Sequence, residues 1–271
     1  MFPCISLIFW LALRTRKIFL QFEEAMFIAC DRRPLLHSYE LFVNPHTRTN
    51  PFSLIAANDV RRLRLSGDCH IPAKVKDMPH LRQLTLSGIT SNLFDRNNLQ
   101  ECFPSANLDE FLYTMGAKDG LILRDHQLRS VAFGIGRSLH KLVLLECSRL
   151  TSTCLAECIE TLHNLRYLAV SVITVDEMNA NFLMLLPRTV TVLKVSINNA
   201  GYTIPFVEQE ETICDTLEID VFNRRPALDS IAVSFRSELM DDGDRRDRWT
   251  KMCQERKISL YIGNWMQNEI V

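Results

Sequence analysis

The segment Leu139–Cys147 constrains the fold more than any other part of the chain. It reads LHKLVLLEC, and the alternation of Leu142 and Leu144 within it is typical of a short strand with one buried side. Residues 151–162, TSTCLAECIETL, carry apolar side chains at helical spacing. The pattern restarts at Leu165, 26 residues after its first position. One strand, one turn and one helix therefore form a unit, which cannot bury its apolar side unless further units stack against it.

Further copies of this unit occur on both sides. Their starting positions are separated by 21 to 38 residues, which is too uneven for near-identical modules. A strand is also expected within LLHSYELFV (residues 35–43), ahead of the first copy. The copies begin at Val60, Leu81, Leu108, Val190 and Leu228, and a last strand is expected at Ile258, Leu260 and Ile262.

These copies follow the pattern L-x-x-L-x-L-x-x-N/C, so the chain resembles leucine-rich-repeat proteins. The resemblance implies an α/β solenoid in which a curved parallel sheet carries its helices on the convex side. Cys147 and Asn198 fill the last position of the pattern, where a short polar or thiol side chain supports the turn. The other copies need different contacts to hold that turn, because they have Ile89, Gly116, Ile173 and Arg236 there.

Helical periodicity and end signals predict the segments that return the chain between strands. The acidic run at 208–211 is expected to face solvent and the helix dipole. The DDGD sequence at 241–244 is interpreted as a solvated turn, because it lacks the ligand spacing of a calcium loop. Helices are expected over residues 51–58, 91–103, 121–135, 174–186, 207–222 and 245–256.

Composition excludes several classes of function. The chain has 271 residues and a net charge of −1, which predicts no general attraction to nucleic acid or to an anionic membrane. Its nine cysteines include no C-x-x-C pair, so they are interpreted as small buried apolar residues, and no metal and no cofactor is expected. The same cysteines favour a reducing compartment, the cytoplasm or the nucleus.

The first thirteen residues, MFPCISLIFWLAL, are almost entirely apolar. A bilayer-spanning helix needs about 20 such residues. A secretory signal carries its positive charges ahead of the apolar run, whereas Arg14, Arg16 and Lys17 follow it here. The favoured interpretation is a buried helix, and a cleaved signal in a secreted protein is the alternative.

The N-terminal region also resembles fungal F-box proteins with irregular leucine-rich repeats. Phe2-Pro3 opens a first helix, and a second helix ends in IACDRRPL (residues 28–35), where Arg33 occupies the tryptophan position of the family signature. The resemblance implies a degenerate F-box-like helical segment with a cap strand over residues 1–45 and a repeat domain over residues 46–271. It also implies that the N-terminal helices bind the linker subunit of an SCF-type cullin-RING ubiquitin ligase through Pro3, Leu7, Ile8, Phe9, Cys30 and Leu35.

Residues between the fixed apolar positions are expected on the concave side, because successive strand side chains alternate. A column of small hydroxyl residues there, such as Ser171 and Ser196, is attributed to strand packing. An apolar centre with a basic rim is typical of a protein-binding surface, although a helix or the insertion at 199–206 could cover it. The apolar centre comprises Leu112, Val143, Leu145, Tyr167 and Val192, and the rim comprises Arg62, Arg64, Lys141 and Lys194.

No catalytic arrangement emerges from the sequence. The seven histidines are scattered, and no nucleophile stands in a recognisable elbow. His140 and Cys147 lie at opposite ends of one expected strand, about 23 Å apart at roughly 3.3 Å per residue. The sequence thus predicts a non-enzymatic protein-recognition scaffold and, by resemblance, a substrate receptor of a ubiquitin ligase. The alternative is a leucine-rich-repeat binding module unrelated to ubiquitination.

Overall fold

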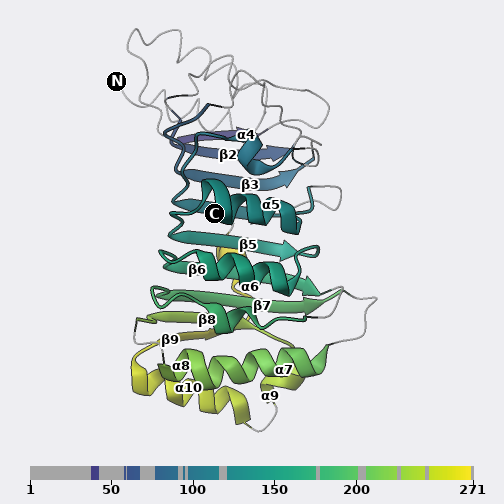
Figure 1. The fold of residues 1–271 in the computed structure, drawn as a ribbon. Helices are drawn as coiled ribbons and strands as arrows, with labels where there is room; N and C mark the ends of the chain where they lie inside the picture. Colours follow the sequence, from purple (N-terminus) through teal and green to yellow (C-terminus); the bar gives the residue numbers. More distant parts are fainter. Residues whose placement is uncertain are drawn as a thin grey trace, which may run out of the picture.

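Nine parallel strands form one sheet in which each strand pairs with the next one in the chain (Figure 1). The computed structural model describes residues 38–42, 58, 60–67, 77–90, 94, 97–115, 121–174, 178–200, 206–224, 227–241 and 244–269. The strands are β1 Ser38–Phe42, β2 Arg62–Gly67, β3 Gln83–Ile89, β4 Glu110–Thr114, β5 Lys141–Cys147, β6 Tyr167–Thr174, β7 Val192–Asn199, β8 Ser230–Ser234 and β9 Ser259–Ile262.

The register of the sheet confirms the strand alignment expected from the sequence pattern. The second apolar position of each unit pairs with that of its neighbours, and the position after it forms a neighbouring row. A slip of one residue would have moved every core side chain to the other face. The paired core row is Leu63, Leu84, Phe111, Leu142, Leu168, Leu193, Ile231 and Leu260.

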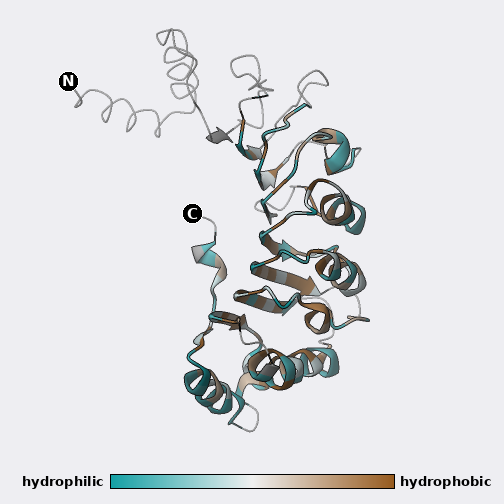
Figure 2. Cartoon of the chain, turned by 60° about the vertical axis from the view of Figure 1, so that its left-hand side comes forward, coloured by the Kyte–Doolittle hydropathy of each residue, from teal (hydrophilic) through white to brown (hydrophobic). Residues whose placement is uncertain are grey.

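Helices α4, α5, α6 and α7 lie along one side of the sheet (Figures 1 and 2). The helical segments are α4 Leu99–Cys102, α5 Asp125–Ser130, the π-helical η4 Val131–Ile135, α6 Ser152–Thr161, the 3-10 turn η5 Phe182–Leu185, α7 Val207–Thr216, the π-helical η6 Leu217–Val221, α8 Phe222–Arg224, α9 Ser237–Asp241, α10 Arg245–Arg256 and the 3-10 turn η8 Met266–Asn268. The expected helices over 207–222 and 245–256 are confirmed.

Other expected helices are shorter than predicted. Residues 121–124 lie outside the helix, because the Leu121 amide donates to the Ile89 carbonyl and the Tyr113 hydroxyl bonds both the Leu121 carbonyl and the Leu123 amide. Thr174 ends strand β6 instead of starting a helix, and only a 3-10 turn follows in the described part of 174–186. In 91–103 the described continuous helix is α4. The helix expected at 51–58 lies outside the described residues except for Asn58.

The main hydrophobic core lies between the sheet and the helices. The core row of the sheet is buried from Leu63 to Ile231, with exposed fractions of 2% or less. The cysteines in the described residues are buried as expected, packed as small apolar side chains. They are Cys102, Cys147, Cys154, Cys158, Cys214 and Cys253.

The turn that leaves each strand is held in different ways. The Cys147 thiol is buried and lies 3.8 Å from the Leu145 carbonyl oxygen, and Ile89 is buried in the core at the equivalent position. Arg236 instead forms a bidentate ion pair with Glu210 of α7, with nitrogen–oxygen distances of 2.8 and 2.6 Å. Glu210 is 1% exposed, so the expectation that the whole acidic run faces solvent is wrong for this residue.

Candidate functional site

The side of the sheet opposite the helices carries the side chains predicted to bind a partner. We call it the helix-free face. Lys141, Tyr167 and Val192 lie side by side on β5, β6 and β7, and Leu112 pairs with Val143. The residues expected on the concave side, between the fixed apolar positions, therefore do lie on one surface. Its central row is Arg64, Thr85, Leu112, Val143, Ala169, Lys194, Ala232 and Tyr261.

The centre of this face is covered, which corrects the expectation of an exposed apolar patch. Val143 is 0% exposed and Leu145 is 1% exposed. They belong to a second hydrophobic cluster, separate from the main core, in which Ala169 and Ala232 pack with Trp265. Leu112, Tyr167 and Met266 border this cluster and are partly buried. The covering segment is the C-terminal stretch 263–269, which we call the tail, and the sequence interpretation had not considered it.

The tail reaches the helix-free face because the chain turns directly after β9. Gly263 has φ of 151°, a conformation that favours glycine, and its amide donates to the Val233 carbonyl. Trp265 follows, 2% exposed, and its indole N–H donates to the Val195 carbonyl oxygen at 3.2 Å. Figure 2 shows the C-terminal segment on the side of the sheet away from the helices. The tail therefore lies across β7 and its neighbours.

A small charged cluster fixes the far end of the tail. Glu269 accepts a hydrogen bond from the Tyr167 hydroxyl at 2.5 Å and forms an ion pair with Lys194. The ammonium groups of Lys141 and Lys194 lie 4.9 and 5.5 Å from the centre of the Tyr167 ring, within cation–π range. Burial, together with the hydrogen bond to Glu269, raises the pKa of Tyr167, so its hydroxyl remains a donor at neutral pH. The Glu269 side chain is only 5% exposed.

The end of the face formed by β2 to β4 is less covered. Arg62 is exposed, and Arg64 and Leu112 are partly exposed. Gln83 donates to the Glu110 carboxylate at 2.7 Å, which links β3 to β4 on the same face. The predicted residues thus divide into an accessible basic end and a centre occupied by the tail.

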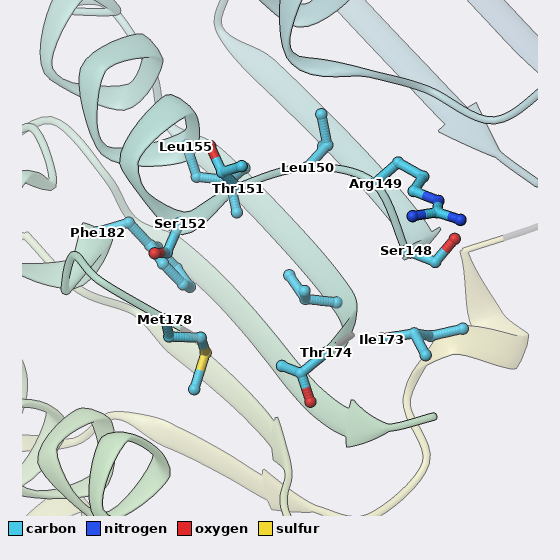
Figure 3. Close-up of a pocket in the computed structure, with 11 residues that line it drawn as sticks. Ser148, Arg149, Leu150, Thr151, Ser152, Leu155, Ile173, Thr174, Met178 and Phe182 are labelled. Carbon is cyan, nitrogen blue, oxygen red and sulfur yellow. The ribbon is translucent and has the colours of Figure 1, made fainter. Parts of the chain in front are cut away.

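A small pocket lies at the carboxyl ends of β5 and β6 (Figure 3). Its volume is about 80 Å³, and Leu150, Leu155 and Phe182 are among its lining residues. Ligand pockets are typically 300–1,000 Å³. Two of the hydroxyls at its wall already have partners, since Ser152 accepts from the Ala180 amide and Thr174 donates to the Asn198 carbonyl. Nothing in this pocket indicates a substrate or a cofactor.

The reactive side chains of the described chain are dispersed. His80, His126, His140 and His163 are exposed. Burial raises the pKa of the Cys253 thiol to about 11 and that of the Cys214 thiol to about 12, which disfavours the nucleophilic thiolate of these two residues at neutral pH. Within the described ranges no group of three or more His, Cys, Asp or Glu side chains is placed to hold a metal ion.

The residues predicted to contact a ligase linker lie outside the described residues. They are Pro3, Leu7, Ile8, Phe9, Cys30 and Leu35. The cap strand expected within residues 35–43 is confirmed as β1, which pairs in parallel with β2. The domain boundary after residue 45 stays a prediction.

The residues of this candidate site that the sequence did not predict are Trp265, Met266 and Glu269. They follow the last strand in GNWMQNE, a stretch without strand or helix periodicity. A tryptophan in such a polar stretch was the one available signal, because a large aromatic side chain normally finds a buried site.

Comparison with known proteins assigns no family to this chain, so its function is inferred from the fold and the helix-free face. The chain matches no family model and no curated protein. Among the described residues, no helix combines the length and the apolar character needed to cross a membrane.

Proposed function

We propose that this protein is a leucine-rich-repeat solenoid that acts as a non-enzymatic protein-recognition scaffold. Support comes from parallel strands in chain order, each unit returning on the helix side, with apolar side chains at the same register in successive strands. A fold of this kind exposes one sheet face along its length. Function is argued from that face, because the fold alone does not define it.

The observation that carries the proposal is the composition of the helix-free face. Arg62 and Arg64 border a surface that also presents Leu112 and the Gln83–Glu110 pair. Basic and apolar groups side by side, with polar neighbours, are suited to a protein surface of complementary charge. Neither the 80 Å³ pocket nor the buried thiols offer comparable chemistry for a small substrate.

The resemblance of the N-terminal residues to F-box proteins supplies the cellular role in this proposal. The protein would be a substrate receptor of an SCF-type ubiquitin ligase in the cytoplasm or the nucleus, with its target on the helix-free face. Positioning the target would be its whole contribution to ubiquitin transfer.

Affinity capture with the intact chain tests both parts of the proposal. The intact chain should capture the linker and cullin subunits, and replacing Leu7, Ile8 and Phe9 with alanine should abolish that capture while leaving the target bound. The double variant Arg62→Glu/Arg64→Glu should release the target and keep the linker. A target captured without any linker would favour a binding module unrelated to ubiquitination, and capture indifferent to the arginine pair would contradict the assigned face.

A further inference from the structure

The tail occupies a site on the helix-free face that is shaped for an aromatic side chain. At the centre of this face, β6 and β8 carry Ala169 and Ala232, whereas β7 between them carries Lys194. The two alanines are small, and the Trp265 side chain packs with them in the buried cluster that also contains Val143 and Leu145. The indole N–H finds a backbone acceptor, the Val195 carbonyl. A buried tryptophan with its N–H satisfied is the usual form of an anchor residue at a protein interface.

The same site recognises a carboxylate at a fixed distance from the aromatic anchor. Tyr167 and Lys194 both bond Glu269, and Lys141 lies over the Tyr167 ring. Glu269 stands four residues after Trp265, and the single 3-10 turn of η8 between them sets the spacing. Glu110 on the same face is paired in register with Lys141 and accepts a hydrogen bond from Gln83. The site thus holds an aromatic side chain and a carboxylate that stand four residues apart in the chain.

One buried hydroxyl on the helix-free face has no partner in the described chain. Ser171 is 0% exposed, and its hydroxyl has no hydrogen-bond partner among the described residues. It lies two residues beyond Ala169 on β6, on the same face of the sheet. A buried hydroxyl without a partner is unfavourable, so a segment that brings a polar group to Ser171 would bind better than the tail.

The attachment of the tail permits exchange. Beyond Gly263, its described hydrogen bonds to the sheet come from Trp265 and Glu269. Gly263 provides a pivot, since its φ of 151° requires glycine and lies directly after the last strand. The tail can therefore leave without breaking the sheet pairing of β9.

We propose that this site binds, in a partner protein, a segment with an aromatic residue followed four positions later by an acidic residue, and that the tail occupies the site when the partner is absent. The inference rests on the proposed recognition function and specifies its partner. In this proposal the accessible basic end of the face, with Arg62 and Arg64, contacts the same partner.

A direct binding measurement tests this inference on the full-length chain. The probe is a fluorescent peptide with the sequence of residues 264–271, NWMQNEIV. It should bind the variant Trp265→Ala/Glu269→Gln at least about tenfold more tightly than the intact chain, because the attached tail competes at an effective concentration in the millimolar range. A peptide with alanine at the tryptophan position should not bind either protein. Adding Lys141→Glu and Lys194→Glu to the variant should abolish binding of the unaltered peptide.

Two outcomes overturn the inference. One is a tail variant that keeps its cooperative unfolding transition and does not bind the peptide. The other is amide hydrogen exchange in residues 264–269 of the intact chain that is as slow as in β6 and β7. This second measurement does not depend on whether the variant folds. Faster exchange in the tail is expected of a segment that opens locally. Neither experiment involves a ligase subunit, so failure to capture the linker and failure to bind the peptide are separate results.

Discussion

Removing one partner of the ion pair between Arg236 and Glu210 is predicted to be one of the most destabilising single changes outside the hydrophobic core. Both guanidinium bonds are short, 2.8 and 2.6 Å, and the exposed fractions of the two side chains are 22% for Arg236 and 1% for Glu210. Arg236→Met removes the cation and leaves the carboxylate buried. Breaking a buried pair from one side costs about 3–5 kcal/mol.

This cost is large compared with the total stability of a domain, which is about 5–15 kcal/mol. Urea unfolding followed by circular dichroism should show it as a lower midpoint at unchanged slope. The unfolding temperature should fall by roughly 6–20 °C, at about 2–4 °C per kcal/mol for a domain of this size. The double variant Glu210→Leu/Arg236→Met should recover most of the loss, because an apolar pair carries no desolvation penalty.

A matched control separates burial from ion pairing as such. Arg129 and Glu157 form a pair at 2.9 Å whose side chains are 44% and 46% exposed. Arg129→Met should cost no more than about 1 kcal/mol, since solvent screens an exposed pair. If Arg236→Met costs as little as this control, or if the double variant is as unstable as the single one, the reasoning about the buried carboxylate is refuted.

Three further predictions concern other contacts of the described chain. Burial alone would raise the pKa of Glu218, but the hydrogen bonds from Arg248 and Trp249 outweigh it and hold the pKa below its ordinary value of 4.5. The stability that Glu218 contributes is therefore present above pH 4.5 and is lost as the pH falls through the lower pKa of the folded state. Glu218→Gln should therefore flatten the decline of the urea midpoint below pH 4.5. An unchanged decline would contradict this. Tyr113→Phe should cost about 1–3 kcal/mol in the same assay, because it leaves the buried Leu121 carbonyl and Leu123 amide without the hydroxyl; a cost near zero would show that these groups find other partners. Of the nine thiols, at most three should react with a thiol reagent in the native protein and all nine after unfolding, because six are buried; a fourth reactive thiol in the native state would refute the assigned burial.

The extent to which the sequence predicted this structure follows from how local each interaction is. Strand positions were predictable because a two-residue alternation with one buried side permits a single register, as the paired row through Leu142 and Leu168 confirms. Helix ends were less predictable. Residues 121–124 stay out of the helix because Tyr113, on the preceding strand β4, bonds their backbone. Thr174 likewise stays in β6, where its hydroxyl donates to the Asn198 carbonyl of the neighbouring strand.

The candidate site likewise has a part that the sequence predicted and a part that it did not. The sequence by itself determined which side chains share the helix-free face, because alternation along each strand and the recurrence of the pattern are local properties. Only the tertiary structure decided that this face is occupied at its centre. The contacts of Trp265 with the Val195 carbonyl and of Glu269 with Lys194 join residues that are far apart in the chain, and no periodicity in residues 263–269 indicates them. The pairing of Arg236 with Glu210 was also decided by the tertiary structure, because a buried charge needs an opposite charge close to it in space, whatever their separation in sequence.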